Sequence, residues 1–126
     1  MTKGDTLPTE TVSALIVAAD SALALSLESM LYAHDFVPTI HDPGLGLLSL
    51  PLGADTHLIV DFKLLSPDPG AFLSVVRKTG WRGAAVLMTE RALGPKWTPL
   101  ERCWTVEKPF VSANLLAVFR EILSSP

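Results

Sequence analysis

The sequence has little of what several classes of protein require. Its single cysteine, Cys103, excludes an internal disulfide framework and a zinc site built on cysteines. Its ten Lys and Arg residues form no cluster, and the formal net charge of -3 argues against a surface that binds nucleic-acid phosphates. No stretch approaches the roughly 20 apolar residues that span a bilayer, and residues 1–11 lack the apolar core of a secretory signal. We therefore expect a cytoplasmic protein without a nucleic-acid or membrane partner.

Apolar residues, in contrast, are plentiful enough for a folded core. The chain has 126 residues, of which 48% are hydrophobic and 18% are charged. This length fits one domain with one core, and this composition excludes wholesale disorder. We expect a flexible N-terminal segment at residues 1–11, followed by a single domain over residues 12–126.

Short apolar runs alternate along the chain with helical patterns, which is typical of βα units around a parallel sheet. Four runs have almost no polar alternation, as strands buried on both faces require. They are Ala14–Ala18, Leu58–Val60, Ala84–Met88 and Cys103–Val106. A fifth strand fits at Phe36–Ile40, where Pro38 removes a ladder donor and so restricts the strand to a sheet edge. The predicted fold class is α/β, with a parallel five-stranded sheet in the order 2-1-3-4-5 and helices on both faces.

Three helices are clearly marked in the sequence. Asp20 or Ser21 caps the first, which continues through an apolar repeat at helical spacing. Asp68–Pro69 begins another helix, which Gly80 terminates. Ser112 caps the last helix, whose apolar residues form one face.

Two further segments are weakly marked as helices. Asp42–Pro43 begins one in a suitable way, but Gly44 and Pro51 weaken its continuation. The segment at residues 90–100 is poorer, because Gly94–Pro95 leaves no room for a helix longer than about one or two turns.

Polar side chains follow the third, fourth and fifth strands at the point where each strand ends. Asp61, Thr89 and Lys108 occupy these positions, and Pro109 follows the lysine. Because binding sites of open parallel sheets lie at the carboxyl ends of the strands, we expect these side chains to meet there. Taken singly, Asp61 and Thr89 also suit simple caps or turns, and Lys108 suits a solvated surface. Their joint occurrence favours a site.

The same residues carry a resemblance to a known family. The segments LIVAAD, HLIVDFKLL, AAVLMTE and VEKPF resemble the receiver domain of bacterial two-component response regulators, over about residues 13–123. The resemblance implies a flavodoxin-like (βα)5 domain. It also implies that Asp61 accepts a phosphoryl group from a histidine kinase, that Thr89 hydrogen-bonds the phosphoryl oxygens and that Lys108 pairs with them.

The sequence departs from the family pattern at the metal site. The family has two adjacent acidic residues after the first strand, which hold Mg²⁺, and here these positions are Ala18 and Ala19. Mg²⁺ prefers carboxylate oxygens, which two methyl groups do not provide. Asp20 is the remaining acid, and a shift of the first strand by one residue would bring it into the second position. We expect weak or absent Mg²⁺ binding and no other cofactor.

Two further positions near the site depart from the pattern. Lys63 would place an ammonium group in the emptied metal site, where it is a candidate counter-ion of Asp61. Thr105 stands at the position of the family's aromatic switch residue, and Trp104 should point to the opposite face of its strand.

The remaining chemically active side chains do not form a pattern of their own. His34, His41 and His57 lack the spacing of a metal site, so we interpret them as ordinary surface or partly buried histidines. Cys103 begins an apolar strand, which favours a small core residue over a reactive thiol.

The resemblance and its departures favour a divergent receiver that acts mainly through protein-protein interaction in a two-component phosphorelay, with Mg²⁺-dependent phosphorylation weakened or lost. Its partner would be a histidine kinase or another signalling protein, and a homodimer is compatible with the sequence. No output segment follows Leu123, so the signal is expected to pass by contact with another chain. The alternative is a working phospho-acceptor at Asp61, whose catalysis would be limited to transfer to and from itself. A small enzyme or flavin carrier is disfavoured, because no phosphate-binding loop or catalytic dyad is visible.

Overall fold

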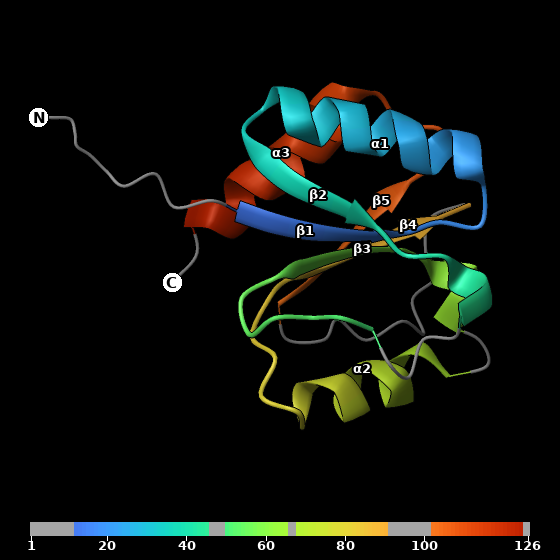
Figure 1. Cartoon of the computed structure of the whole chain (residues 1–126), viewed down its shortest axis with the longest axis vertical. Coiled ribbons are helices and arrows are strands. Elements are labelled where there is room, and N and C mark those ends of the chain that lie inside the picture. Colours follow the sequence, from blue (N-terminus) through green and yellow to red (C-terminus); the bar gives the residue numbers. More distant parts are fainter. Residues whose placement is uncertain (1–11, 46–49, 66–67, 91–101, 125–126) are drawn as a thin grey trace, which may run out of the picture.

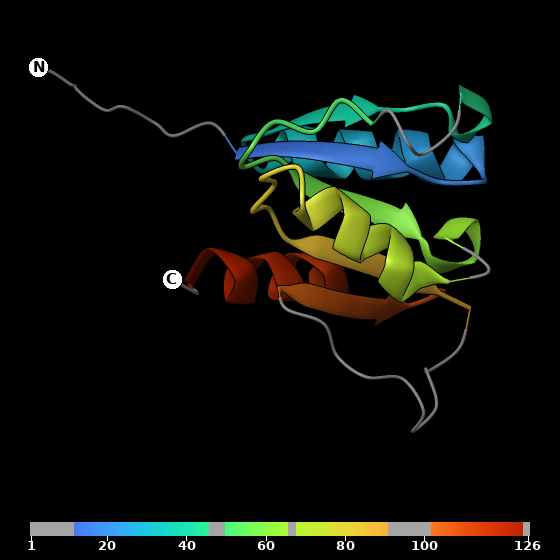
Figure 2. The ribbon, with the colours of Figure 1, turned by 90° about the horizontal axis from the view of Figure 1, so that it is seen from below.

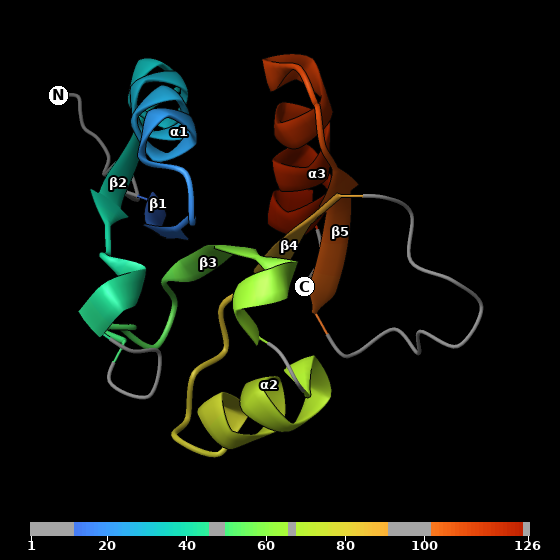
Figure 3. The same ribbon diagram turned by 90° about the vertical axis from the view of Figure 1, so that its right-hand side faces the viewer.

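The chain folds around one parallel β-sheet. The computed structural model describes residues 12–45, 50–65, 68–90 and 102–124, so the predicted flexible segment at residues 1–11 lies outside the described residues. The strands are β1 (Val12–Val17), β2 (Phe36–Ile40), β3 (His57–Asp61), β4 (Ala85–Thr89) and β5 (Cys103–Glu107). The strands labelled in Figure 1 lie in the order β2-β1-β3-β4-β5, which Figure 3 shows from the side, and all of them point the same way (Figure 2). The predicted fold class and strand order are confirmed.

The edge strand β2 is protected from further pairing by its proline. The His41 N–H donates to the carbonyl oxygen of Ile16 in β1, at 2.9 Å. Because donors of a parallel strand alternate between its two sides, position 38 faces away from β1. Pro38 therefore removes a donor from the open edge of the sheet and costs no hydrogen bond inside it.

Helices cover both faces of the sheet. They are α1 (Ser21–Ala33), α2 (Pro69–Arg77) and α3 (Ser112–Ser124). The first and the last pack on one face, and α2 packs on the other (Figure 3). Among the described residues, no helix combines the length and the apolar character that crossing a membrane requires.

Two caps agree with the sequence and one does not. Asp20 accepts hydrogen bonds from the backbone N–H groups of the first turn of α1, and Asp68 does the same for α2. Ser112 is not the cap of α3, because the helix already includes it as its first residue. Instead, the Asn114 side chain accepts from the Val111 N–H at 2.9 Å, which is the reciprocal half of a capping box.

Of the two weakly marked segments, one forms only a short turn and the other lies almost wholly outside the described residues. A short 3₁₀ turn at Pro43–Leu45 follows β2, and Asp42 Oδ1 accepts from the Gly44 N–H at 2.8 Å. This side-chain bond satisfies the backbone locally and competes with a longer helix. The segment at residues 90–100 lies outside the described residues, except for Glu90.

The two central strands, β3 and β4, end in buried polar residues. Every residue of β3 and β4 is buried. Both strands have a neighbouring strand on each side, and helices cover the two faces of the sheet, so even the last residues of β3 and β4 are shielded from water. For this reason Asp61 and Thr89, which end these strands, are a buried carboxylate and a buried hydroxyl.

His57 is a buried polar residue at the other end of β3. Its Nδ1 accepts a hydrogen bond from the Ala84 N–H at 3.0 Å, which requires the neutral ring. Burial lowers the pKa of His57, and the charge of Arg102 lowers it further against the opposing effect of Asp55. The histidine is therefore part of the core between β3 and the start of β4.

This burial predicts a dependence of stability on pH. The unfolded chain, in which a histidine has a pKa of about 6.5, binds the proton more tightly than the folded chain. The stabilisation is therefore complete above that pH and is lost as the pH falls toward the lower folded pKa. We expect the unfolding free energy to fall below about pH 6.5, by at most about 1.4 kcal/mol per pH unit for one group.

Chemical denaturation of the wild type at several pH values between neutral and mildly acidic checks this expectation. His57→Gln should flatten the profile, whereas His34→Gln, which alters an exposed ring, should leave the slope in place. An unchanged slope in His57→Gln would show that this ring does not control acid stability.

Candidate functional site

Asp61, Thr89 and Lys108 lie together at the carboxyl ends of neighbouring strands, as the sequence predicts. Asp61 ends β3 and is in register with Met88, so the end of β4 lies beside it. Thr89 ends β4, and its carbonyl oxygen accepts from the Lys108 N–H at 2.7 Å. This backbone bond holds the lysine directly after β5, next to the carboxylate.

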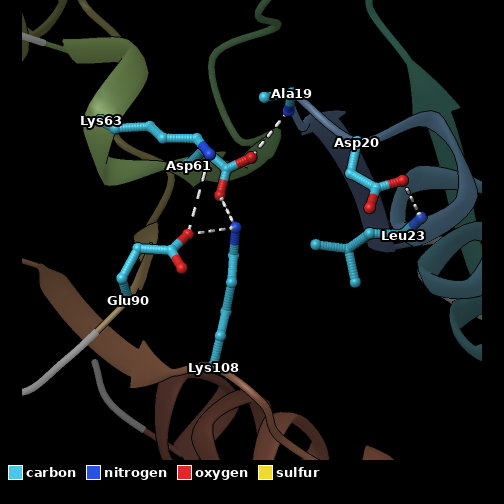
Figure 4. A network of polar contacts seen from close by, with 7 residues as sticks. All are labelled: Ala19, Asp20, Leu23, Asp61, Lys63, Glu90 and Lys108. Carbon is cyan, nitrogen blue, oxygen red and sulfur yellow. Dashed lines mark hydrogen bonds and ion pairs between the residues drawn. The ribbon is translucent and has the colours of Figure 1, made fainter.

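Both oxygens of Asp61 already have partners within the chain. Oδ2 accepts a hydrogen bond from the Ala19 N–H at 2.7 Å, and Oδ1 contacts Nζ of Lys108 (Figure 4). The carboxylate is almost completely buried, with 1% of its side chain exposed. Because a buried charge is costly unless it is paired and hydrogen-bonded, these two contacts are the condition for a charged Asp61 at this place.

Lys108 joins the buried carboxylate to a second one nearer the surface. Its side chain is 17% exposed, and Nζ lies 3.2 Å from Oε2 of Glu90. Burial by itself lowers the pKa of Lys108, but its hydrogen bonds to Asp61 and Glu90 and their negative charges outweigh burial and raise the pKa. Lys108 is therefore a firmly charged group between two carboxylates.

Lys63 has a different partner from the one proposed for it. Its Nζ lies 3.8 Å from Oε2 of Glu90, and both side chains are more than half exposed. The cation in contact with Asp61 is Lys108. The hypothesis that Lys63 is the counter-ion of Asp61 is corrected, because Lys63 pairs with Glu90 and Asp61 pairs with Lys108.

Glu90 is the residue of this site that the sequence interpretation missed. It directly follows Thr89 and begins the segment at residues 90–100, for which the sequence predicts no helix longer than about one or two turns. Its available signal was its position, one residue after the end of a central strand.

The four charged side chains balance one another. Asp61 and Glu90 supply two carboxylates, and Lys63 and Lys108 supply two ammonium groups, so their formal charges sum to zero. Among the described side chains of this site, positive and negative formal charges are therefore equal in number.

The residues around Asp61 do not fit a Mg²⁺ ion. The side chains of Ala18 and Ala19 are methyl groups, which cannot ligate a cation, and the N–H of Ala19 already engages Asp61. The Asp20 carboxylate is turned toward α1, where Oδ1 accepts from the N–H groups of Ala22 at 2.8 Å and Leu23 at 3.3 Å (Figure 4). The alternative register, with Asp20 in the metal-binding position, is therefore wrong, because Asp20 is the N-cap of α1.

Strand β5 carries the expected switch position. Thr105 is exposed, and Trp104 packs on the opposite face of the sheet, as alternation along a strand predicts. The indole N–H of Trp104 donates to Oε1 of Glu121 in α3 at 2.9 Å. Pro109, which follows Lys108 through a cis peptide bond, is exposed at the start of the connection to α3.

No second reactive centre is found in the part of the chain that the structure describes. It contains no group of three His, Cys, Asp or Glu residues that could hold a metal. Cys103 packs on the α2 side of the sheet, and burial raises the pKa of its thiol to about 11, against a smaller opposing effect of Arg77. A thiol with this pKa stays protonated near neutral pH, so Cys103 is not an activated nucleophile.

Comparison with solved structures identifies the fold. No protein-family model matches the chain, and no curated protein matches it either. A response regulator receiver protein from Sinorhizobium medicae matches with a TM-score of 0.67 and 22% identity, over 92% of this chain and 97% of that one. The chain has the receiver fold.

Two further receiver structures agree with this assignment. A CheY-like receiver domain from Methylobacillus flagellatus has a TM-score of 0.67 and 20% identity, over 90% of this chain and 99% of that one. A response regulator from Thermotoga maritima has the same TM-score and 14% identity, over 92% of this chain and 100% of that one. The receiver fold therefore covers nearly the whole chain.

The buried ion pair of this receiver fold predicts a marked effect of removing the Asp61 charge. Asp61→Asn keeps an acceptor for the Ala19 N–H but leaves Lys108 without its buried partner. Because Lys108 retains Glu90, we expect a loss of about 1–3 kcal/mol of unfolding free energy, less than for a fully isolated buried charge. Chemical denaturation at neutral pH measures this loss.

The matched comparison is Lys63→Met, which breaks only an exposed ion pair. It should change the unfolding free energy by less than about 0.5 kcal/mol. Equal effects of the two substitutions would contradict the assignment of Lys108 as the counter-ion.

Proposed function

We propose that this protein is a divergent receiver of a two-component signalling pathway, which acts through protein-protein contact and in which phosphorylation of Asp61 is weakened or lost. One observation carries the proposal. Both Asp61 oxygens are engaged by Ala19 and Lys108, and the other described carboxylate of the site, Glu90, is paired with Lys63 and Lys108. The protein is then a binding module with no enzymatic activity toward another molecule.

The chemistry of phosphoryl transfer supports this proposal. An oxygen of Asp61 would have to approach the phosphorus atom, and positive charge would have to neutralise the negative charge on the transferred group. Oδ1 is buried against the Lys108 ammonium, which lowers its ability to attack. Lys108 is shared between two carboxylates, and Lys63 faces Glu90, so neither cation is uncommitted.

The partner of such a module is a histidine kinase or another protein of the same pathway. Recognition would then depend on the shape of the receiver fold and on its exposed side chains, because the site changes little without phosphorylation. A second copy of the chain is a further candidate partner. The proposal retains the cytoplasm as the setting, in which a lone cysteine such as Cys103 stays reduced.

A working phospho-acceptor is the second candidate, and one observation favours it. Asp61 contacts Lys108, and the Thr89 carbonyl oxygen accepts from the Lys108 N–H, at the carboxyl ends of the strands. For transfer to proceed, Lys63 would have to leave Glu90 and supply part of the charge that a metal ion would otherwise provide.

Intact-mass analysis separates the two candidates. The purified protein is incubated with a small acyl-phosphate donor and Mg²⁺, beside Asp61→Asn and beside a receiver that has the acidic pair. We expect labelling of the receiver with the acidic pair, and no phosphorylated species in this protein above the level of Asp61→Asn. A phosphorylated species that disappears in Asp61→Asn would contradict the proposal and establish the acceptor function.

A further inference from the structure

Glu90 lies between two lysines of the site. Its Oε2 atom lies 3.2 Å from Nζ of Lys108 and 3.8 Å from Nζ of Lys63 (Figure 4). One carboxylate oxygen is thus shared by two ammonium groups from different parts of the chain. Lys63 follows β3, and Lys108 follows β5.

Two converging ammonium groups are a usual way to bind an oxyanion. Each lysine offers three donors and a full positive charge, without any acceptor of its own. At this site the anion between them is supplied by the chain itself. An oxyanion from solution would meet the same two lysines only after Glu90 had moved away.

We propose that Glu90 is an internal anion that fills an oxyanion site formed by Lys63 and Lys108, and that its displacement opens this site to a tetrahedral oxyanion such as phosphate. The inference concerns the same site as the proposed function, and its role in signalling rests on that proposed function. It does not require a covalent bond to Asp61.

The difference in burial between the two carboxylates shows why Glu90 is the one that can leave. The Asp61 side chain is 1% exposed, whereas that of Glu90 is 62% exposed and pairs with the half-exposed Lys63. Exposed ion pairs are weak, because water screens both charges. Displacement of Glu90 breaks its contacts with Lys63 and Lys108 and leaves the contact between Asp61 and Lys108 in place.

The charge that remains after this displacement favours an anion. Asp61 stays in place with Lys63 and Lys108, and these three groups carry one net positive charge. A doubly charged oxyanion gains more from this field than a monocarboxylate, which only reproduces the charge of Glu90. The site should therefore prefer phosphate to acetate.

Binding of inorganic phosphate to Glu90→Gln tests the proposal. The probe is sodium phosphate near neutral pH at constant ionic strength, and binding is followed by NMR shifts of backbone amides around residues 61–63 and 108. We expect Glu90→Gln to bind phosphate at least tenfold more tightly than the wild type. Adding Lys63→Met to this variant should remove most of the gain.

Glu28→Gln is the matched control, because it removes the same charge from α1. It should bind phosphate no better than the wild type. The proposal is overturned if Glu90→Gln shows no gain, if Glu28→Gln gains as much, or if the gain survives intact after Lys63→Met.

This experiment and the test of the proposed function can fail separately. Phosphate binding is measured without a phosphodonor, so a missing gain in Glu90→Gln contradicts only the role of Glu90. Labelling of the wild type at Asp61 by a phosphodonor contradicts the proposed function, whatever the affinity of Glu90→Gln for free phosphate.

Discussion

The contact between Asp61 and Lys108 is the interaction on which the rest of the site depends. The receiver fold places the end of β3 in the middle of the sheet, so a carboxylate at this position is removed from water. A buried carboxylate has to be neutralised, and here an ammonium group from the end of β5 and the N–H of Ala19 do so. The backbone bond from Lys108 to the Thr89 carbonyl holds the ammonium group in reach.

The described charged side chains around this contact also balance one another. With Ala18 and Ala19 after β1, an uncompensated excess of carboxylates does not arise, and Lys63 and Glu90 add one charge of each sign. Asp61 and Lys108 are mostly buried, whereas Lys63 and Glu90 are more than half exposed. Loss of the buried pair should therefore cost more unfolding free energy than loss of the exposed pair.

The sequence predicts the fold and the meeting of Asp61, Thr89 and Lys108, because strand order and strand ends determine backbone positions. It does not predict the partners of long side chains. Lys63 and Lys108 both lie within reach of Asp61 in a sequence argument, and only burial and direction at the turn select Lys108. Glu90 was missed because it follows the strand in an unpatterned segment. The short turn after Asp42 and the helix start at Ser112 differ from prediction because local side-chain bonds determine them.

Metal binding tests the central claim of a site balanced without a divalent cation most directly. The wild type and an Ala18→Asp/Ala19→Asp variant are titrated with Mg²⁺ into the millimolar range, and the amide of residue 19 is followed by NMR because it donates to Asp61. The account predicts no saturable shift in the wild type and a saturable shift in the variant, which restores two carboxylates. Saturable Mg²⁺ binding by the wild type at this amide would contradict it.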